Sequence, residues 1–203
     1  MDEVYEIAQV GRPAPSFDAQ ALVDGEITRV SLSEYRGKWV VLFFYPGDFT
    51  FVCPTELATI AERYEAFTSR GIVVLAISVD SPQTHMAWQE HELSKMIEGG
   101  VPYPMLTDRG GLIGEQYLVY DQEEGTDLRG FFIIDPDGVL QVVQVLNASM
   151  GRDVDEMLRL IHGAQYVYAR QGEQLPACWH PGDETLKAGD ELVGKVWETW
   201  KKK

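Results

Sequence analysis

Two short apolar runs, residues 39–45 and residues 72–79, stand out in the first half of the chain. Both are rich in β-branched or aromatic side chains and have almost no polar interruption, which is typical of strands buried on both faces of a sheet. Between the two runs, apolar residues recur at the spacing of a helix that faces a core: Leu57, Ile60, Ala61, Tyr64 and Phe67. We therefore expect a β-α-β unit with a right-handed crossover.

Two hairpins are predicted on either side of this unit. Residues 16–33 alternate apolar and polar positions around Asp24-Gly25, a dipeptide that favours a tight hairpin turn. Further along, Phe131–Ile134 and Val139–Leu146 flank a second strong turn signal at residues 135–138. Three more helices are expected at Ser81 to about Ile97, with Ser81 as N-cap and Pro82 in the first turn, at Leu112–Tyr117, and at Arg152–Arg170.

These elements predict an α/β protein of the thioredoxin-like fold class. It has a central mixed β-sheet flanked by helices, an N-terminal hairpin and an extended C-terminal arm. From Gln171 onward the composition changes to Gly, Pro and charged residues, and Leu192–Trp200 is only weakly amphipathic. We therefore expect a domain over residues 1–170 and an arm over residues 171–203.

Composition and charge narrow the function. The chain has 203 residues, a net charge of −15 and a pI near 4.6, which argues against binding to nucleic acid or to anionic membranes. The one basic run, Lys201–Lys203, is interpreted as a solvated tail. No apolar run approaches the roughly 18 residues of a membrane span, and the acidic N-terminus, Met1–Glu6, lacks the features of a signal peptide. We expect a cytoplasmic protein.

The most informative residue is Cys53. It follows the strand at residues 39–45 and a proline turn, and it opens the helix that carries Leu57, with Pro54 in its first turn. The sulfur is thus expected at the positive end of a helix, among backbone N–H groups that stabilise a thiolate. The partner position of a Cys-x-x-Cys motif is occupied by Glu56, so any disulfide has to involve Cys178 or another molecule.

Three further residues fit chemistry at this sulfur. Thr50 lies three residues before Cys53, and Pro46 is placed to cover the pocket. Arg129 immediately precedes the strand at Phe131–Ile134, so its guanidinium is expected at the same end of the sheet. A guanidinium there favours a thiolate and binds an oxygen ligand through several donors. A dehydrated thiolate, a hydroxyl and a cation together suit attack of sulfur on an O–O bond. The product is a sulfenic acid, which a second thiol captures as a disulfide.

The pattern Pro46-x-x-x-Thr50-x-x-Cys53, extended through Pro54-Thr55-Glu56, resembles the active-site signature of the two-cysteine peroxiredoxins. This group includes the C-subunits of alkyl hydroperoxide reductases and the thioredoxin peroxidases. Two more segments resemble the same family: Arg129-Gly130-x-Phe132-Ile133-Ile134-Asp135 and Gly151-Arg152-x-Val154-Asp155-Glu156. The resemblance extends from about Val10 to Trp179.

The resemblance implies a thiol-dependent peroxidase that acts on hydrogen peroxide and organic hydroperoxides with no metal, haem or flavin of its own. Cys53 would be the peroxidatic nucleophile, Thr50 and Arg129 would polarise the peroxide, and Pro46 would shield the sulfur. Glu56 and Arg152 match the family's supporting hydrogen-bond network. The resemblance further implies a homodimer that pairs through Val139–Leu146, a ring of such dimers (a decamer), and reduction by thioredoxin or by a dedicated flavoprotein disulfide reductase.

The C-terminal arm departs from the family pattern. The family usually has its resolving cysteine in Gly-Glu-Val-Cys-Pro-Ala-x-Trp, whereas this chain has Leu175 at that position and Cys178 three residues later. Three extended residues span about 10 Å, a displacement that a flexible arm has to absorb. We expect Cys178 to resolve Cys53 of a partner subunit. A one-cysteine cycle, or a redox-linked holdase on the same scaffold, are the alternatives.

Overall fold

The computed structural model describes residues 6–200. The predictions for residues 1–5 and for Lys201–Lys203 lie outside the described residues. The chain divides into two compact units, Met1–Val154 and Asp155–Lys203. Within residues 6–200, no helix is both long enough and apolar enough to cross a membrane.

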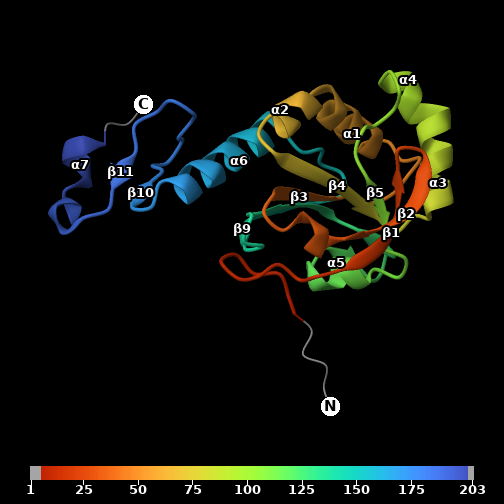
Figure 1. Cartoon of the computed structure of the whole chain (residues 1–203), viewed down its shortest axis with the longest axis horizontal. Helices are drawn as coiled ribbons and strands as arrows, with labels where there is room; N and C mark the ends of the chain where they lie inside the picture. The colour runs from red at the N-terminus through yellow and green to blue at the C-terminus, as the bar shows by residue number, and fades with distance from the viewer. Residues whose placement is uncertain (1–5, 201–203) are drawn as a thin grey trace, which may run out of the picture. The chain divides into compact units, whose positions relative to one another are not determined.

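The first unit is built on a seven-stranded mixed sheet with the order β2-β1-β5-β4-β3-β8-β9. At its centre, β3 (Trp39–Phe44) and β4 (Ile72–Ser78) pair in parallel, with Leu42 opposite Leu75. The helices between them complete the predicted β-α-β unit. Figure 1 shows α1 (Cys53–Glu62) and α2 (Tyr64–Thr68) over one face of the sheet and α5 (Leu112–Gln116) against the other. The predicted fold class is therefore confirmed.

Both predicted hairpins are present. β1 (Asp18–Val23) and β2 (Glu26–Ser31) join through Asp24 and Gly25, whose φ angles of +49° and +81° suit a turn that twists with its strands. β8 (Arg129–Ile134) and β9 (Leu140–Leu146) form the second hairpin, and β9 is an edge strand of the sheet. In its turn, Asp135 accepts a hydrogen bond from the backbone N–H of Val139 at 2.9 Å.

The helix after β3 is interrupted, contrary to the single continuous helix that the apolar spacing predicts. α1 ends at Glu62, Arg63 is its C-terminal capping residue, and α2 follows as a separate segment over Tyr64–Thr68. Leu57, Ile60 and Phe67 are fully buried as expected. The break falls within the solvent-facing part of the pattern, so it leaves the buried stripe intact.

The next helix also departs from regularity. Ser81 caps α3 (Pro82–Trp88) by accepting a hydrogen bond from the N–H of Thr84, as predicted. A π-helical turn, η2 (Gln89–Leu93), follows and leads into α4 (Ser94–Met96). The remaining elements of the first unit are η1 (Leu32–Tyr35), β5 (Met105–Thr107), β6 (Tyr120–Asp121) and β7 (Thr126–Asp127).

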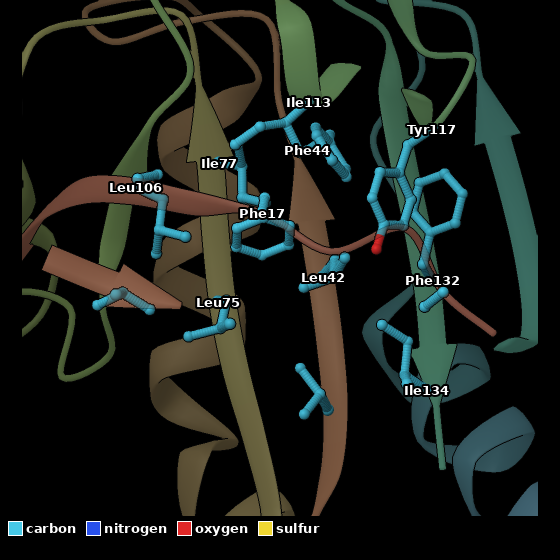
Figure 2. Close-up of a cluster of buried hydrophobic side chains, with 14 of the residues drawn as sticks. Phe17, Leu42, Phe44, Leu75, Ile77, Leu106, Ile113, Tyr117, Phe132 and Ile134 are labelled. Carbon is cyan, nitrogen blue, oxygen red and sulfur yellow. The ribbon is translucent and has the colours of Figure 1, made fainter. Parts of the chain in front are cut away.

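The main apolar core lies between the sheet and α5. Leu42 and Phe44 of β3, Ile77 of β4 and Phe132 of β8 belong to this core. Phe44 and Phe132 lie against Tyr117, which follows α5 (Figure 2). Tyr117 contacts Phe132 and Phe44 with ring centroids 5.0 and 5.5 Å apart. Because side chains alternate along a strand, Phe43 points away from this core. That opposite face carries the candidate site.

The second unit contains most of α6 (Val154–Ala169) and the arm that follows it. The arm forms a small two-stranded sheet from β10 (Glu173–Gln174) and β11 (Leu186–Lys187). Two short helical turns complete it, η3 (Asp190–Leu192) and α7 (Val196–Thr199).

Candidate active site

Cys53 is the first residue of α1, and its side chain is fully buried. β3 ends at Phe44, and residues 45–52 form the loop that turns the chain into the helix. Phe49 adopts a left-handed backbone, with φ of +53°, within that loop. The sulfur therefore lies where the sequence predicts it, at the N-terminus of a ten-residue helix, which attracts negative charge.

Arg129 contacts this sulfur directly through a hydrogen bond. Its Nη1 donates to the Sγ of Cys53 at 3.3 Å and to Oε2 of Glu56 at 2.6 Å. Its Nε donates to the backbone oxygen of Ala148 at 2.7 Å, which fixes the plane of the guanidinium. Only 3% of Arg129 is exposed, so its charge acts on the sulfur with little screening by water.

Glu56 and Arg152 complete a buried charge cluster. Oε1 of Glu56 accepts from the backbone N–H and Nε of Arg152 at 2.7 and 2.8 Å, and Oε2 accepts from Nη2 at 3.0 Å. Nη1 of Arg152 donates to the carbonyls of Phe44 and Gly130, and its guanidinium stacks over the ring of Phe43. The structure thus brings Cys53, Arg129, Glu56 and Arg152 together.

The charges of this cluster do not cancel. Two guanidiniums face one carboxylate, which leaves a net charge of +1 beside a neutral thiol and zero beside a thiolate. Burial lowers the pKa of Arg152, and the hydrogen bonds and charge of Glu56 oppose that change. The cluster therefore places an uncompensated positive charge next to the sulfur of Cys53.

Thr50 and Pro46 lie on the loop before α1, and both are partly buried. The hydroxyl of Thr50 donates to the backbone oxygen of Gly47 at 2.8 Å. The hydroxyl proton of Thr50 is therefore used in the hydrogen bond to Gly47, and the hydroxyl oxygen can accept a hydrogen bond from another group. The sequence predicted the Thr50 hydroxyl but not that it donates its hydrogen bond to Gly47.

An open hollow of about 540 Å³ lies beside Thr50. Its lining combines apolar side chains with polar ones: Phe49, Phe51, Met96, His91, Glu92 and Lys95. Phe51 is 95% exposed, and the ring of Phe49 lies 6.2 Å from that of Trp88. The loop therefore carries exposed aromatic surface next to the candidate site.

The sequence analysis missed a buried polar network beneath the same loop. Nδ1 of His85 lies 2.7 Å from Oδ2 of Asp48, whose Oδ1 accepts from the hydroxyl of Tyr45 at 2.8 Å. The backbone N–H of Asp48 donates to Asp80 at 2.8 Å. Burial raises the pKa of Asp48, and the hydrogen bond from His85 opposes this. The network holds the loop that carries Pro46 and Thr50, and its one sequence signal was a histidine on the buried face of α3.

Cys178 belongs to the second unit, where it is exposed and has a left-handed backbone with φ of +61°. Both cysteines are free thiols. The backbone carbonyl oxygen of Cys178 lies 3.0 Å from Nδ1 of His180.

A mixed sheet with helices on both faces, and a buried cysteine at a helix N-terminus that accepts a hydrogen bond from a buried arginine, define a thiol enzyme of the thioredoxin-like class. Residues 10–143 match the model of the AhpC/TSA family, and the chain belongs to that family. It is 50% identical over 195 residues to a selenocysteine-containing peroxiredoxin, PrxU, of Peptoclostridium acidaminophilum, covering 96% of each chain.

Two more relatives support the same assignment. The chain is 48% identical over 185 residues to a thioredoxin peroxidase of Echinococcus granulosus, covering 90% of this chain and 95% of that one. Among solved structures, the reduced 2-Cys peroxiredoxin of Plasmodium vivax superposes with a TM-score of 0.87 at 37% identity. That match covers 94% of this chain and 98% of the other. The resemblance inferred from the motifs is confirmed.

Proposed function

We propose that this protein is a thiol-dependent peroxidase that reduces hydrogen peroxide and organic hydroperoxides through Cys53. The observation that carries the proposal is the 3.3 Å contact between Arg129 and the buried sulfur, within a cluster of net charge +1. Membership of the peroxiredoxin family supports it. The two-cysteine cycle, the reductant and the assembly described below are parts of the same proposal.

In the first step, the thiolate of Cys53 attacks one peroxide oxygen and the O–O bond breaks. Sulfur is oxidised to sulfenic acid, and the leaving oxygen departs as water or alcohol after taking up a proton. The guanidinium of Arg129 stabilises the negative charge that moves onto the oxygens. Thr50 orients the peroxide by accepting its O–H hydrogen bond, because its own proton is held by Gly47. Pro46 limits access of water.

In the second step, Cys178 of a partner subunit attacks the sulfenic sulfur, so that a disulfide forms and hydroxide leaves as water. Thioredoxin or a dedicated flavoprotein disulfide reductase then returns both thiols. In this division, residues 1–170 carry the peroxidatic site and the arm, residues 171–203, brings the resolving cysteine. A reducing compartment such as the cytoplasm keeps both thiols ready for the next turnover.

The proposed homodimer pairs through β9, and such dimers assemble into a ring, a decamer. β9 supports this because it is an edge strand whose Val143 and Val145 are each 39% exposed. An apolar edge strand of this kind is a surface for pairing with a second copy.

The experiment mixes reduced protein with one equivalent of hydrogen peroxide and follows peroxide loss and the products. Wild-type protein should consume the peroxide and migrate as a cross-linked dimer in non-reducing electrophoresis. Cys53→Ser should consume none, whereas Cys178→Ser should consume one equivalent and remain monomeric. Peroxide loss that survives in Cys53→Ser would overturn the proposal. A wild-type protein that consumes peroxide without cross-linking would instead support a one-cysteine cycle, and a holdase would consume none.

A further inference from the structure

A second thiol cannot reach the sulfur of Cys53 while the first turn of α1 stays folded. Cys53 is the first residue of this helix and is fully buried. A disulfide requires the two sulfurs to come within about 2.05 Å, with their Cβ atoms about 3.8 Å apart. The resolving step of the proposed cycle therefore begins with an opening at the start of α1. The contacts that hold this turn control how often the sulfur becomes accessible.

A hydrogen bond from outside the helix holds α1 at the end of this turn. The hydroxyl of Tyr103 donates to the backbone oxygen of Leu57 at 2.7 Å. Leu57 lies four residues after Cys53, the spacing at which a helical N–H donates back to the first carbonyl of the turn. Tyr103 is 3% exposed, and its ring lies 5.7 Å from that of Tyr64 in α2. Burial raises the pKa of Tyr103 well above its ordinary value, so the hydroxyl keeps the proton that it donates.

The segment that carries Tyr103 is itself fixed on both sides of the tyrosine. The side chain of Gln89, in η2, donates to the backbone oxygen of Val101 at 2.9 Å and accepts from the backbone N–H of Val101 at 3.0 Å. Beyond Tyr103, the backbone oxygen of Pro104 accepts from the N–H of Ala76 in β4 at 3.0 Å. Prolines directly before and after Tyr103 restrict the backbone further. The tyrosine hydroxyl is therefore held against α1 by an anchored segment.

We propose that Tyr103 is a positioning residue of the catalytic cycle, because its hydrogen bond to Leu57 holds α1 folded and so limits how often Cys53 becomes accessible to a second thiol. The inference rests on the proposed two-cysteine function. Once α1 has opened, the thiolate of Cys178 attacks the sulfur of the Cys53 sulfenic acid. The S–S bond forms, the S–O bond breaks, and hydroxide leaves and is protonated to water.

The same hydrogen bond favours a competing reaction. While α1 stays folded, the sulfenic acid remains beside Arg129, where a second peroxide can oxidise it. The sulfur gains a second oxygen and becomes a sulfinic acid, and the peroxide is reduced to water or alcohol. Tyr103 therefore shifts the balance between disulfide and sulfinic acid toward the sulfinic acid.

The test separates the two chemical steps in Tyr103→Phe. Phenylalanine keeps the packing of the ring, and the Leu57 carbonyl keeps its acceptor role within the helix, so no buried group loses its only partner. Rapid-quench mass spectrometry after one equivalent of peroxide gives the rates of sulfenic acid and disulfide formation. Sulfenic acid should form at the wild-type rate, and the disulfide should form about fivefold faster, the factor expected for one lost hydrogen bond. The sulfinic acid fraction at excess peroxide should fall by a similar factor.

A control variant and a second measurement sharpen the test. Tyr64→Phe removes the hydroxyl of the neighbouring ring and should leave both rates unchanged. Hydrogen exchange at residues 56–58 measures the opening of α1 directly, and in Tyr103→Phe it should be about fivefold faster there but unchanged in β3 and β4. An unchanged disulfide rate, slower formation of both products, or faster exchange throughout the unit would overturn the inference. Failure of the proposed function is distinct: wild-type protein would then form no disulfide, while exchange would still report on α1.

Discussion

Asp127 offers the sharpest test of the physical account, because it is a buried carboxyl without a partner. It ends β7, two residues before Arg129, and is 1% exposed. Neither of its side-chain oxygens has a hydrogen-bond partner among residues 6–200. Burial raises its pKa to about 8, and the nearby charge of Asp108 adds to the rise. We predict that Asp127→Asn stabilises the protein near neutral pH and removes a pH dependence of its stability.

The sign follows from the proton count. An unfolded aspartate titrates near 3.9, so between about pH 4 and about pH 8 the folded protein holds a proton that the unfolded chain has lost. The free energy of unfolding falls by about 1.4 kcal/mol per pH unit across this window, or about 4 kcal/mol by pH 7. The asparagine has the same shape and does not titrate, but its buried N–H groups lack acceptors at a cost of about 1–3 kcal/mol. The net gain at pH 7 is therefore about 1–3 kcal/mol.

Urea unfolding at fixed protein concentration, at pH 5, 6, 7 and 8, measures this directly. The free energies of unfolding of wild type and Asp127→Asn should diverge as pH rises, and the variant should be more stable relative to wild type at each higher pH. Glu124→Gln removes an exposed carboxylate near the same short hairpin and should follow the wild-type curve. Parallel curves for wild type and Asp127→Asn over this range would refute the assigned protonation.

The remaining predictions concern the site, a helix cap and the edge strand. Glu56→Gln leaves two buried guanidiniums without a counter-charge and should lower the free energy of unfolding by about 3–5 kcal/mol; a loss below 1 in urea unfolding would contradict this. Ser81→Ala removes the α3 cap and should cost about 1 kcal/mol in the same assay, and no change would count against the cap. Val143→Glu with Val145→Glu should give monomers in analytical ultracentrifugation, whereas Ile27→Glu on the opposite edge strand should not. Monomers from Ile27→Glu alone would place the dimer at the other edge.

Local signals in the sequence were sufficient for the central elements. β3 and β4 follow from continuous apolar runs, and the α3 start follows from Ser81 and Pro82. β5 was not predicted, because three residues after Pro104 carry no pattern of their own and become a strand only by pairing with β1 and β4. The π-helical turn at Gln89–Leu93 was equally hidden, since one extra residue in a turn leaves the surrounding composition unchanged.

The site shows the same division between local and tertiary information. The helix context of Cys53 and the motifs at Arg129 and Arg152 predicted which groups meet, and the structure places them in contact. The pair formed by Asp48 and His85 joins residues 37 positions apart on different elements. Asp48 has no local feature that distinguishes it from a surface charge, and the position of His85 on the buried face of α3 does not identify its partner. Only the packing of α3 against the loop reveals the pair.

The identity of Arg129 as an arginine follows from the number of acceptors around it. One side chain reaches the Ala148 carbonyl through Nε and both Glu56 and Cys53 through Nη1. A lysine ammonium is a single point on a flexible stem and lacks the spaced donors that bridge these acceptors. The rigid guanidinium keeps its positive charge at the sulfur, and the hydrogen bond to Glu56 helps to hold the guanidinium in place. The same side chain thus holds the start of β8, pairs with Glu56 and places positive charge beside the sulfur of Cys53.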